Sequence, residues 1–162
     1  MHDTGAFETD KPIANAAIGY TRNGAATPEE LRARRDNITL HVVRGSPAGG
    51  GFSTIEDLQR FAAALLEKRL LNDEYTQLVL GAGPKTGSGS DASGYGFQVE
   101  TVNGHTIVGH RGGFPGSSAS FFMYPNDGYV VVALSNYDSV APVLALRMRD
   151  WSVSEAPPAK VE

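Results

Sequence analysis

Residues 104–118, GHTIVGHRGGFPGSS, contain the residue types in this chain that are best suited to chemistry. The branched pair Ile107 and Val108 favours a strand, and the glycines after it let the backbone come close to another molecule. His110 and Arg111 stand where the strand gives way to glycine. A strand end, a basic side chain and bare backbone N–H groups suit the recognition of a carboxylate or an oxyanion. We therefore expect the functional site of the chain here.

The histidines do not predict a metal site. His105 and His110 are five positions apart, so they point to opposite faces of a regular strand and cannot hold one metal together. His2 and His41 lie in weakly structured segments. The chain has no cysteine, which excludes a disulfide and a thiolate zinc site. We expect neither a metal nor a cofactor.

Composition limits the possible partners. The chain of 162 residues is long enough for one domain with a real core, and its 41% hydrophobic and 20% charged residues are ordinary for a globular protein. A formal charge of −4 and a pI near 5.5 argue against nucleic acid or an anionic membrane as partner. No apolar run approaches the roughly 18 residues of a membrane helix, and residues 1–30 lack the pattern of a signal peptide.

Several elements before the candidate site can be predicted. Residues 1–50 are mostly irregular, with short strands near 16–21 and 38–43. Thr27 followed by proline and two glutamates predicts a short helix to about Arg35. The clearest element is a helix from Ser53 to about Leu70. In it, Ser53 and Glu56 form a capping box, and apolar residues recur at helical spacing: Ile55, Leu58, Phe61, Ala62, Leu65 and Leu66. A shorter helix, capped by Asn72 or Asp73, runs through Leu80.

The second half of the chain predicts strands. After a loop at 81–94, rich in glycine and serine, strands at 95–102 and 105–110 are joined by Asn103-Gly104, a strong hairpin signal. Two more strands follow at 118–124 and 129–135. The last is nearly all apolar, so we expect it to lie centrally with both faces covered. A final helix begins at Asp138 or Ser139 and has apolar side chains available for burial, namely Val143, Leu144, Leu146, Met148 and Trp151.

These elements predict an α+β fold with an antiparallel meander of about four strands flanked by helices. We expect one domain over residues 1–151 and a flexible tail at 152–162.

The order and spacing of these pieces resemble a known family. The loop and helix at 46–71, the hairpin at 95–110, the HRGGFPG segment and the strands through Asn136 resemble the serine beta-lactamase and penicillin-binding-protein superfamily. The resemblance is closest to its class C-like branch, which also holds esterases and D-amino-acid or D-alanyl peptidases. It covers nearly all of residues 1–151 but matches only the C-terminal part of the family's domain. It favours a bacterial, extracytoplasmic protein, although a chain without cysteine also suits the cytoplasm.

Members of this superfamily carry three motifs: Ser-x-x-Lys with the nucleophile, Tyr-x-Asn with an acid/base, and Lys-Thr-Gly or His-x-Gly on a strand. His110-Arg111-Gly112 matches the third motif. The resemblance implies that His110 acts near the nucleophile and that the N–H of Gly113 is one of two oxyanion donors. Arg111, Phe114 and Ser117 are then candidate substrate contacts, although Arg111 faces away from His110 on a regular strand. A histidine in this motif favours an esterase or peptidase over an efficient beta-lactamase.

The first two motifs are missing from this sequence. No serine is followed by lysine three residues later. The one Tyr-x-Asn, at residues 124–126, is explained by turn composition, and Lys85-Thr86-Gly87 falls in the loop at 81–94, where nothing would hold its lysine in place. We therefore interpret the chain as the C-terminal part of a serine acyl hydrolase, inactive alone, whose substrate is a beta-lactam, a D-amino-acid peptide or an ester. Its expected partners are the missing N-terminal part of the domain and further copies of itself.

Two alternatives remain open at this stage. One is a non-catalytic module of the same fold, whose sheet edge binds a peptide or an oligomer partner. The other is an unrelated α+β binding domain that matches by chance.

Overall fold

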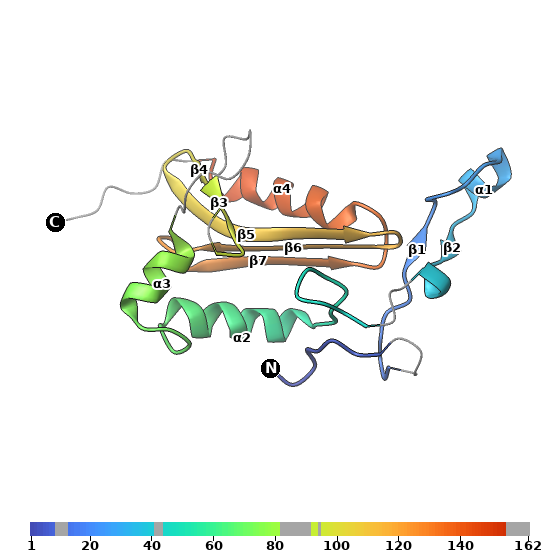
Figure 1. Cartoon of the computed structure of the whole chain (residues 1–162). Helices are drawn as coiled ribbons and strands as arrows, with labels where there is room; N and C mark the ends of the chain where they lie inside the picture. The colour runs from blue at the N-terminus through green and yellow to red at the C-terminus, as the bar shows by residue number, and fades with distance from the viewer. Residues whose placement is uncertain (9–12, 41–43, 82–91, 94, 155–162) are drawn as a thin grey trace.

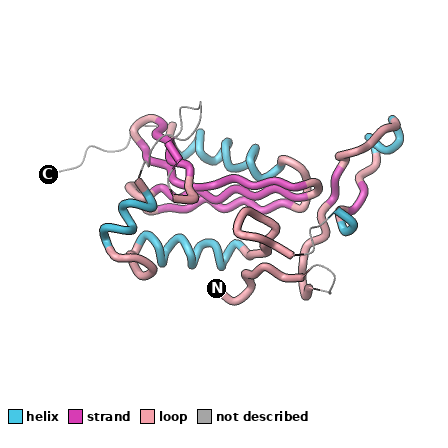
Figure 2. Tube along the Cα trace, viewed as in Figure 1, coloured by secondary structure: helices cyan, strands magenta, loops and turns pink. Residues whose placement is uncertain are grey.

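The computed structural model of the chain describes residues 1–8, 13–40, 44–81, 92–93 and 95–154. An antiparallel sheet lies between helix α4 (Val140–Ser152) on one face and helix α2 (Ile55–Leu66) on the other (Figure 1). Helix α3 (Asp73–Leu80) follows α2 at one end of the sheet, as the colouring by secondary structure in Figure 2 makes plain. This arrangement confirms the predicted α+β fold.

The sheet has the order β3-β4-β5-β6-β7, with every neighbouring pair antiparallel. Its strands are β3 (Ala92–Ser93), β4 (Gln98–Val102), β5 (His105–Phe114), β6 (Ser117–Tyr124) and β7 (Tyr129–Ser135). The meander of four long strands is confirmed. The short β3 falls within the segment predicted as a loop, of which residues 82–91 and 94 lie outside the described part.

Strand β7 corrects one expectation, because it lies at an edge of the sheet and not at its centre. Its apolar run has a different cause. Both α2 and α4 pack against β7, so its side chains need apolar character on both faces, although β6 is its only neighbour among the described strands. Coverage by two helices gives the same sequence pattern as a central position.

Two apolar clusters hold the three layers together. On the α4 side, Ile107 and Phe122 pack with Ala145. On the α2 side, Val108 and Met123 pack with Ala62 and Leu65. Neighbouring residues of β5 thus point into opposite clusters, as the alternation of a strand requires.

Helix α2 begins one residue later than its capping box predicts. Thr54 is the N-cap and accepts a hydrogen bond from the backbone N–H of Asp57 at 3.3 Å, so the predicted Ser53–Glu56 box is wrong. The hydroxyl of Ser53 instead lies 2.8 Å from that of Thr4. The helix also ends at Leu66, short of the predicted Leu70, because the chain turns at Lys68 with a φ of 60°.

Helix α4 buries small residues and exposes large ones, which contradicts the sequence expectation. Ala141 and Ala145 are fully buried against the sheet, whereas Trp151 is 77% exposed. The exposed large side chains lie on one face of the helix and are Val140, Val143, Leu144, Met148 and Trp151. We call these five residues the α4 stripe. Residues 152–154, placed in the predicted tail, include a buried Val153 that accepts a hydrogen bond from Asn103; residues 155–162 lie outside the described part.

Before α2, a short ribbon extends beyond the sheet (Figure 1). It consists of β1 (Tyr20–Thr21), helix α1 (Pro28–Arg32) and β2 (Arg35–Asp36), with β1 and β2 paired. The predicted cap of α1 is confirmed, since Thr27 and Glu30 form a capping box. The predicted strand at 38–43 is wrong over Ile38–Leu40, which form a 3-10 turn, and residues 41–43 lie outside the described part.

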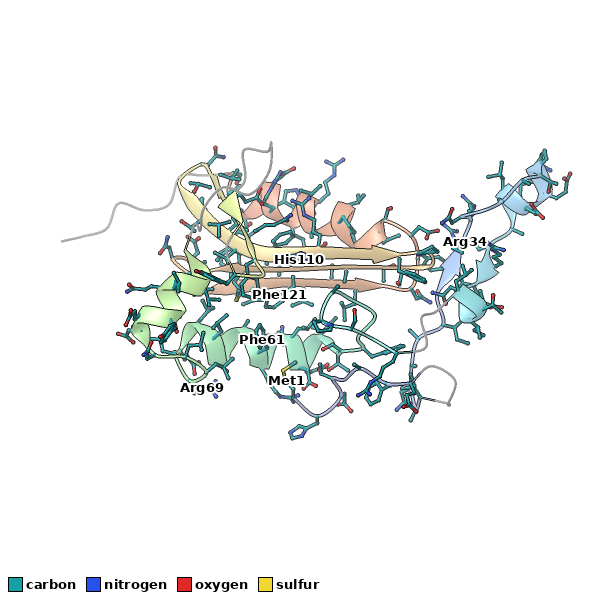
Figure 3. All side chains as sticks on the ribbon, viewed as in Figure 1. Met1, Arg34, Phe61, Arg69, His110 and Phe121 are labelled. Atoms are coloured by element: carbon teal, nitrogen blue, oxygen red, sulfur yellow. The ribbon has the colours of Figure 1, made fainter. Side chains whose placement is uncertain are left out.

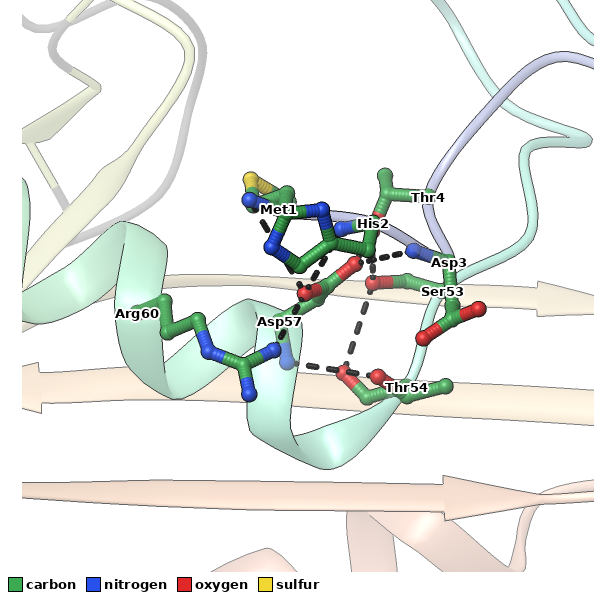
Figure 4. A network of polar contacts seen from close by, with 8 residues as sticks. All are labelled: Met1, His2, Asp3, Thr4, Ser53, Thr54, Asp57 and Arg60. Carbon is green, nitrogen blue, oxygen red and sulfur yellow. Dashed lines mark hydrogen bonds and ion pairs between the residues drawn. The ribbon is translucent and has the colours of Figure 1, made fainter.

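Asp57, in the first turn of α2, ties the beginning of the chain to the helix (Figure 4). Its side chain is fully buried. It accepts hydrogen bonds from the backbone N–H groups of His2 and Asp3 at 3.1 and 2.8 Å, from the hydroxyl of Thr4 at 2.9 Å, and from Arg60 at 2.8 Å. Burial raises the pKa of this carboxyl, but the hydrogen bonds, led by that of Asp3, outweigh burial and hold the pKa well below its usual value.

We predict that Gly109→Ala destabilises the fold and that Gly112→Ala does not. A Cβ at position 109 would meet the backbone of β6 and come within 2.5 Å of the Phe122 ring, whereas one at position 112 has no atom within 4 Å. Overpacking of this kind costs about 1–3 kcal/mol. Urea unfolding of both variants measures the difference, and equal stabilities would contradict the packing of Phe122 against Gly109.

We predict that Asp57→Asn lowers stability more at neutral than at acidic pH. Because the folded pKa is lowered, the ionised carboxylate stabilises the fold above the unfolded pKa of about 3.9, and this contribution is lost as the pH falls through the folded value. Asp73→Asn is the control, since Asp73 is an exposed residue paired with Lys68. Urea unfolding at pH 7 and pH 3 should show a loss for Asp57→Asn that shrinks at pH 3; a loss that does not change with pH would contradict the assignment.

Candidate active site

The far end of β5 extends past its neighbour β4. Strand β4 pairs with β5 only between residues 105 and 109, whereas β6 pairs with β5 as far as Phe114. The predicted glycine bend is therefore wrong in detail, because the strand continues through Gly112 and Gly113 and turns only at Pro115-Gly116. Among the described residues, no strand pairs with residues 110–114 on the β4 side.

The register of the two hairpins fixes which backbone groups face this open edge. The residues that flank the two-residue turn Asn103-Gly104, Val102 and His105, form a hydrogen-bonded pair. Because the pattern alternates along the strand, odd-numbered residues of β5 direct their N–H and C=O groups toward β4. Phe114 and Ser117, which flank the turn at 115–116, likewise form a hydrogen-bonded pair. The backbone groups of even-numbered residues of β5 therefore form hydrogen bonds with β6. Both turns give the same alternation. The N–H of Gly113 therefore faces the open edge and is not used in the ladder with β6.

His110 is exposed at the beginning of this open edge. It lies directly across from Phe121 of β6, whose ring is 6.0 Å from that of Phe61 on α2, so the imidazole lies on the α2 face of the sheet (Figure 3). The other strand histidine differs: His105 is buried, and its Nδ1 lies 2.9 Å from a carboxylate oxygen of Asp127. The imidazole at 110 is thus available to a ligand, while the one at 105 belongs to the core.

Arg111 points to the opposite face, as predicted for a regular strand. Its guanidinium lies 5.4 Å from the centre of the Phe122 ring, on the α4 side. It lines an open hollow of about 630 Å³ between the end of β5 and the start of α4. This hollow is also lined by Gly112, Gly113, Phe114 and Ser117. The structure therefore brings five of the six predicted site residues together around the hollow, with His110 on the other face of the same strand.

Two side chains that sequence analysis did not select fasten the tip of the β5–β6 hairpin. Asn37 accepts a hydrogen bond from the N–H of Gly19 at 3.0 Å and donates one to the carbonyl of Pro115 at 2.9 Å. Asp138 accepts from the N–H of Gly116 at 2.7 Å and from the ribbon that holds β1 and β2. The only sequence signal was the position of Asp138 before α4, where it resembled an ordinary helix cap.

Burial raises the pKa of the Asp138 carboxyl, but its hydrogen bonds outweigh burial. Donors from Gly116, Thr21 and Arg22 hold the pKa below its usual value. Asp138 is therefore ionised at neutral pH and serves as a fixed acceptor beside the hollow.

The remaining sequence motifs do not join the site. Tyr124 is fully buried and its ring stacks on that of Tyr129 at 4.2 Å, which agrees with the structural interpretation of the Tyr-Pro-Asn segment. Lys85-Thr86-Gly87 lies outside the described residues. Within the part of the chain that the structure describes, no three His, Cys, Asp or Glu side chains group together as metal ligands do, and no helix has the length and apolar character needed to span a membrane.

Comparisons with known proteins agree with the fold. A sequence model of the family described as Beta-lactamase matches residues 1–154. No curated protein sequence matches the chain. Among solved structures, the chain is similar to a penicillin-binding protein from Bacillus halodurans, with 27% sequence identity and a TM-score of 0.80, over 93% of this chain and 44% of that one.

Two further structures share the fold. The octameric penicillin-binding protein homologue from Pyrococcus abyssi is 18% identical, with a TM-score of 0.72 over 99% of this chain and 36% of that one. A D-stereospecific amidohydrolase from Streptomyces sp. is 23% identical, with a TM-score of 0.59 over 78% of this chain and 36% of that one. The chain thus spans less than half the length of the solved proteins that it matches. The family match over residues 1–154 shows that the chain belongs to the beta-lactamase family, a family of serine hydrolases.

Proposed function

We propose that this chain is the C-terminal part of a serine acyl hydrolase of the class C-like branch, inactive alone, which cleaves a beta-lactam, a D-amino-acid peptide or an ester through an acyl-serine intermediate. The observation that carries the proposal is the open end of β5, where an exposed His110 and the free N–H of Gly113 stand on one strand. The serine nucleophile and the general base lie outside this sequence.

Each group at this strand end has a role in the proposed reaction. The N–H of Gly113 donates a hydrogen bond to the oxyanion that forms when the serine attacks the acyl carbon. His110 places its imidazole near the serine nucleophile. Gly112 has no side chain, so the backbone beside His110 stays accessible to the substrate. The open edge of residues 110–114 pairs with an extended substrate through main-chain hydrogen bonds.

The hollow on the α4 side suits the remainder of the substrate. Arg111 supplies a positive charge for a substrate carboxylate, and Phe114, 39% exposed, supplies an apolar wall. Ser117 lines the same hollow. Because Arg111 and His110 lie on opposite faces, they contact different parts of a substrate that lies along the edge.

The test is a chimera in which this chain replaces the matching part of the Bacillus halodurans protein. We predict that Gly113→Pro lowers kcat by a factor of about 10²–10³, the usual cost of one lost oxyanion donor. Proline removes an N–H that faces the open edge, so no donor of the ladder with β6 is lost. Gly113→Ala is the control, because it keeps the N–H and its Cβ comes no closer than 4.0 Å to another residue.

Hydrolysis of a chromogenic D-alanyl ester and labelling by a fluorescent penicillin provide the measurements. His110→Ala should also reduce turnover, whereas His2→Ala, at an exposed position beside Asp57 of α2, should not. Equal activity of the proline and alanine variants at position 113 would contradict the oxyanion role.

A non-catalytic module of the same fold is the alternative, favoured by the absence of Ser-x-x-Lys from this sequence. In that case the open edge binds an extended peptide without cleaving it. The module is favoured if the chain binds a D-alanyl-D-alanine peptide and the chimera is not acylated by penicillin. Acylation of the chimera by penicillin would favour the enzyme.

The partner proposed for this chain is the rest of its own domain, which would cover surfaces left open here. The α4 stripe presents five large apolar side chains to solvent, and β7 has an unpaired edge. Exposed apolar faces and free strand edges promote association. One relative of the same fold, from Pyrococcus abyssi, is octameric. Without a covering segment, this chain self-associates.

We predict that Leu144→Lys weakens self-association and that Leu31→Lys does not. Both leucines are 53% exposed, but Leu144 belongs to the α4 stripe whereas Leu31 lies on the ribbon helix α1. Sedimentation velocity at increasing protein concentration measures the effect. A wild-type chain that remains monomeric at high concentration, or equal effects of the two variants, would contradict the role of the stripe.

A further inference from the structure

The tip of the β5–β6 hairpin overhangs the sheet. Strand β4 stops pairing at Gly109, and β7 stops at Ser118 of β6. Among the described strands, residues 113–117 therefore take part only in the pairing of β5 with β6. This overhang includes Gly113, whose N–H is the proposed oxyanion donor, and part of the wall of the hollow.

The turn at this tip is poorly suited to a hairpin. Proline fixes its own φ near −65°, and Gly116 has a φ of 82°. These signs belong to a type II turn, whose twist splays the two strands that it joins, whereas type I′ turns match the strand twist. Asn103 and Gly104, with φ angles of 49° and 85°, provide that better match at the other end of β5. The overhanging tip needs support from outside the hairpin.

That support converges on Asp138. One carboxylate oxygen accepts the N–H of Gly116 at 2.7 Å and the hydroxyl of Thr21 at 3.0 Å, and the other accepts the N–H of Arg22 at 3.2 Å. Thr21 is fully buried in this contact. Asp138 thus contacts the hairpin tip, the ribbon and the start of α4 together, while Asn37 adds a second hydrogen bond to the tip, at the carbonyl of Pro115. The same connection brings Asn23 of the ribbon to the wall of the hollow.

We propose that Asp138 is a positioning residue that holds the end of β5, and with it the N–H of Gly113 and the side chain of Arg111, in the geometry that the site requires. The catalytic benefit of this positioning rests on the proposed function. The structural role of Asp138 in holding the hairpin tip does not depend on catalysis. The hydrogen bonds of the Asp138 carboxylate go to Gly116, Thr21 and Arg22. It acts through Gly116 and the tip of the hairpin.

The test is amide hydrogen exchange, followed by NMR on the full 162-residue chain. Phe114 in the overhang and Gly112 beside it donate to β6, and Val108 donates to the same strand within the sheet. In Asp138→Ala, the exchange rates of Gly112 and Phe114 relative to that of Val108 should rise about tenfold, since bonds to a charged acceptor are lost locally. Urea unfolding checks that the variant remains folded.

The matched control is Asp127→Ala. It removes a carboxylate that is also hydrogen-bonded, to His105, but at the opposite end of the same sheet. Its relative rates at 112 and 114 should stay within about twofold of the wild type. Unchanged relative rates in Asp138→Ala, or an equal rise in the control, would overturn the proposal.

If Asp138→Ala does not fold, Asp138→Asn decides the question. Asparagine keeps one acceptor oxygen for Gly116 and Thr21 but loses the acceptor for Arg22, so a smaller rise in the same amides is expected, and no rise overturns the proposal. Faster exchange of these amides in the Asp138 variant, combined with a chimera that has no hydrolase activity, would refute only the proposed function. An active chimera with unchanged exchange in the variant would refute only the positioning role.

Discussion

The antiparallel pairing of β5 with β6 is the interaction on which the rest of the structure depends. It runs from Val108 to Phe114 on one strand and from Ser117 to Met123 on the other. Its alternation sends Ile107 and Phe122 toward α4 and sends Val108 and Met123 toward α2. The same alternation leaves every second amide beyond Gly109 facing an open edge. The core and the candidate site therefore follow from one register, and a shift by a single residue would exchange the two faces.

Local patterns with a strong physical cause were predictable from the sequence. The Asn103-Gly104 turn, the caps at Thr27 and Asn72, and the strands on either side of the glycines all depend on neighbouring residues alone. The placement of His110 on this strand was predictable for the same reason, although the strand continues beyond it to Phe114. The match of His110-Arg111-Gly112 to the third motif of the family gave this position a chemical meaning.

Features that depend on distant residues were not predictable. The roles of Asp138 and Asn37 arise because segments far apart in sequence meet: Thr21 and Asp138 are 117 positions apart, and Asn37 and Pro115 are 78 apart. An apolar run does not distinguish a central strand from an edge strand under two helices, so β7 was misplaced. Apolar spacing in α4 did not reveal that alanines would face the sheet, because close helix–sheet approach favours small side chains.

The exposure of Trp151 has a practical consequence. It is the single tryptophan of the chain, and it stands at the end of the α4 stripe with most of its ring in solvent. Indole emission shifts to shorter wavelength when water is removed from around the ring. Trp151 therefore acts as an intrinsic fluorescence reporter on the surface where a covering segment or a second copy would lie. Binding of either one to that face should shift its emission to shorter wavelength, without an added label.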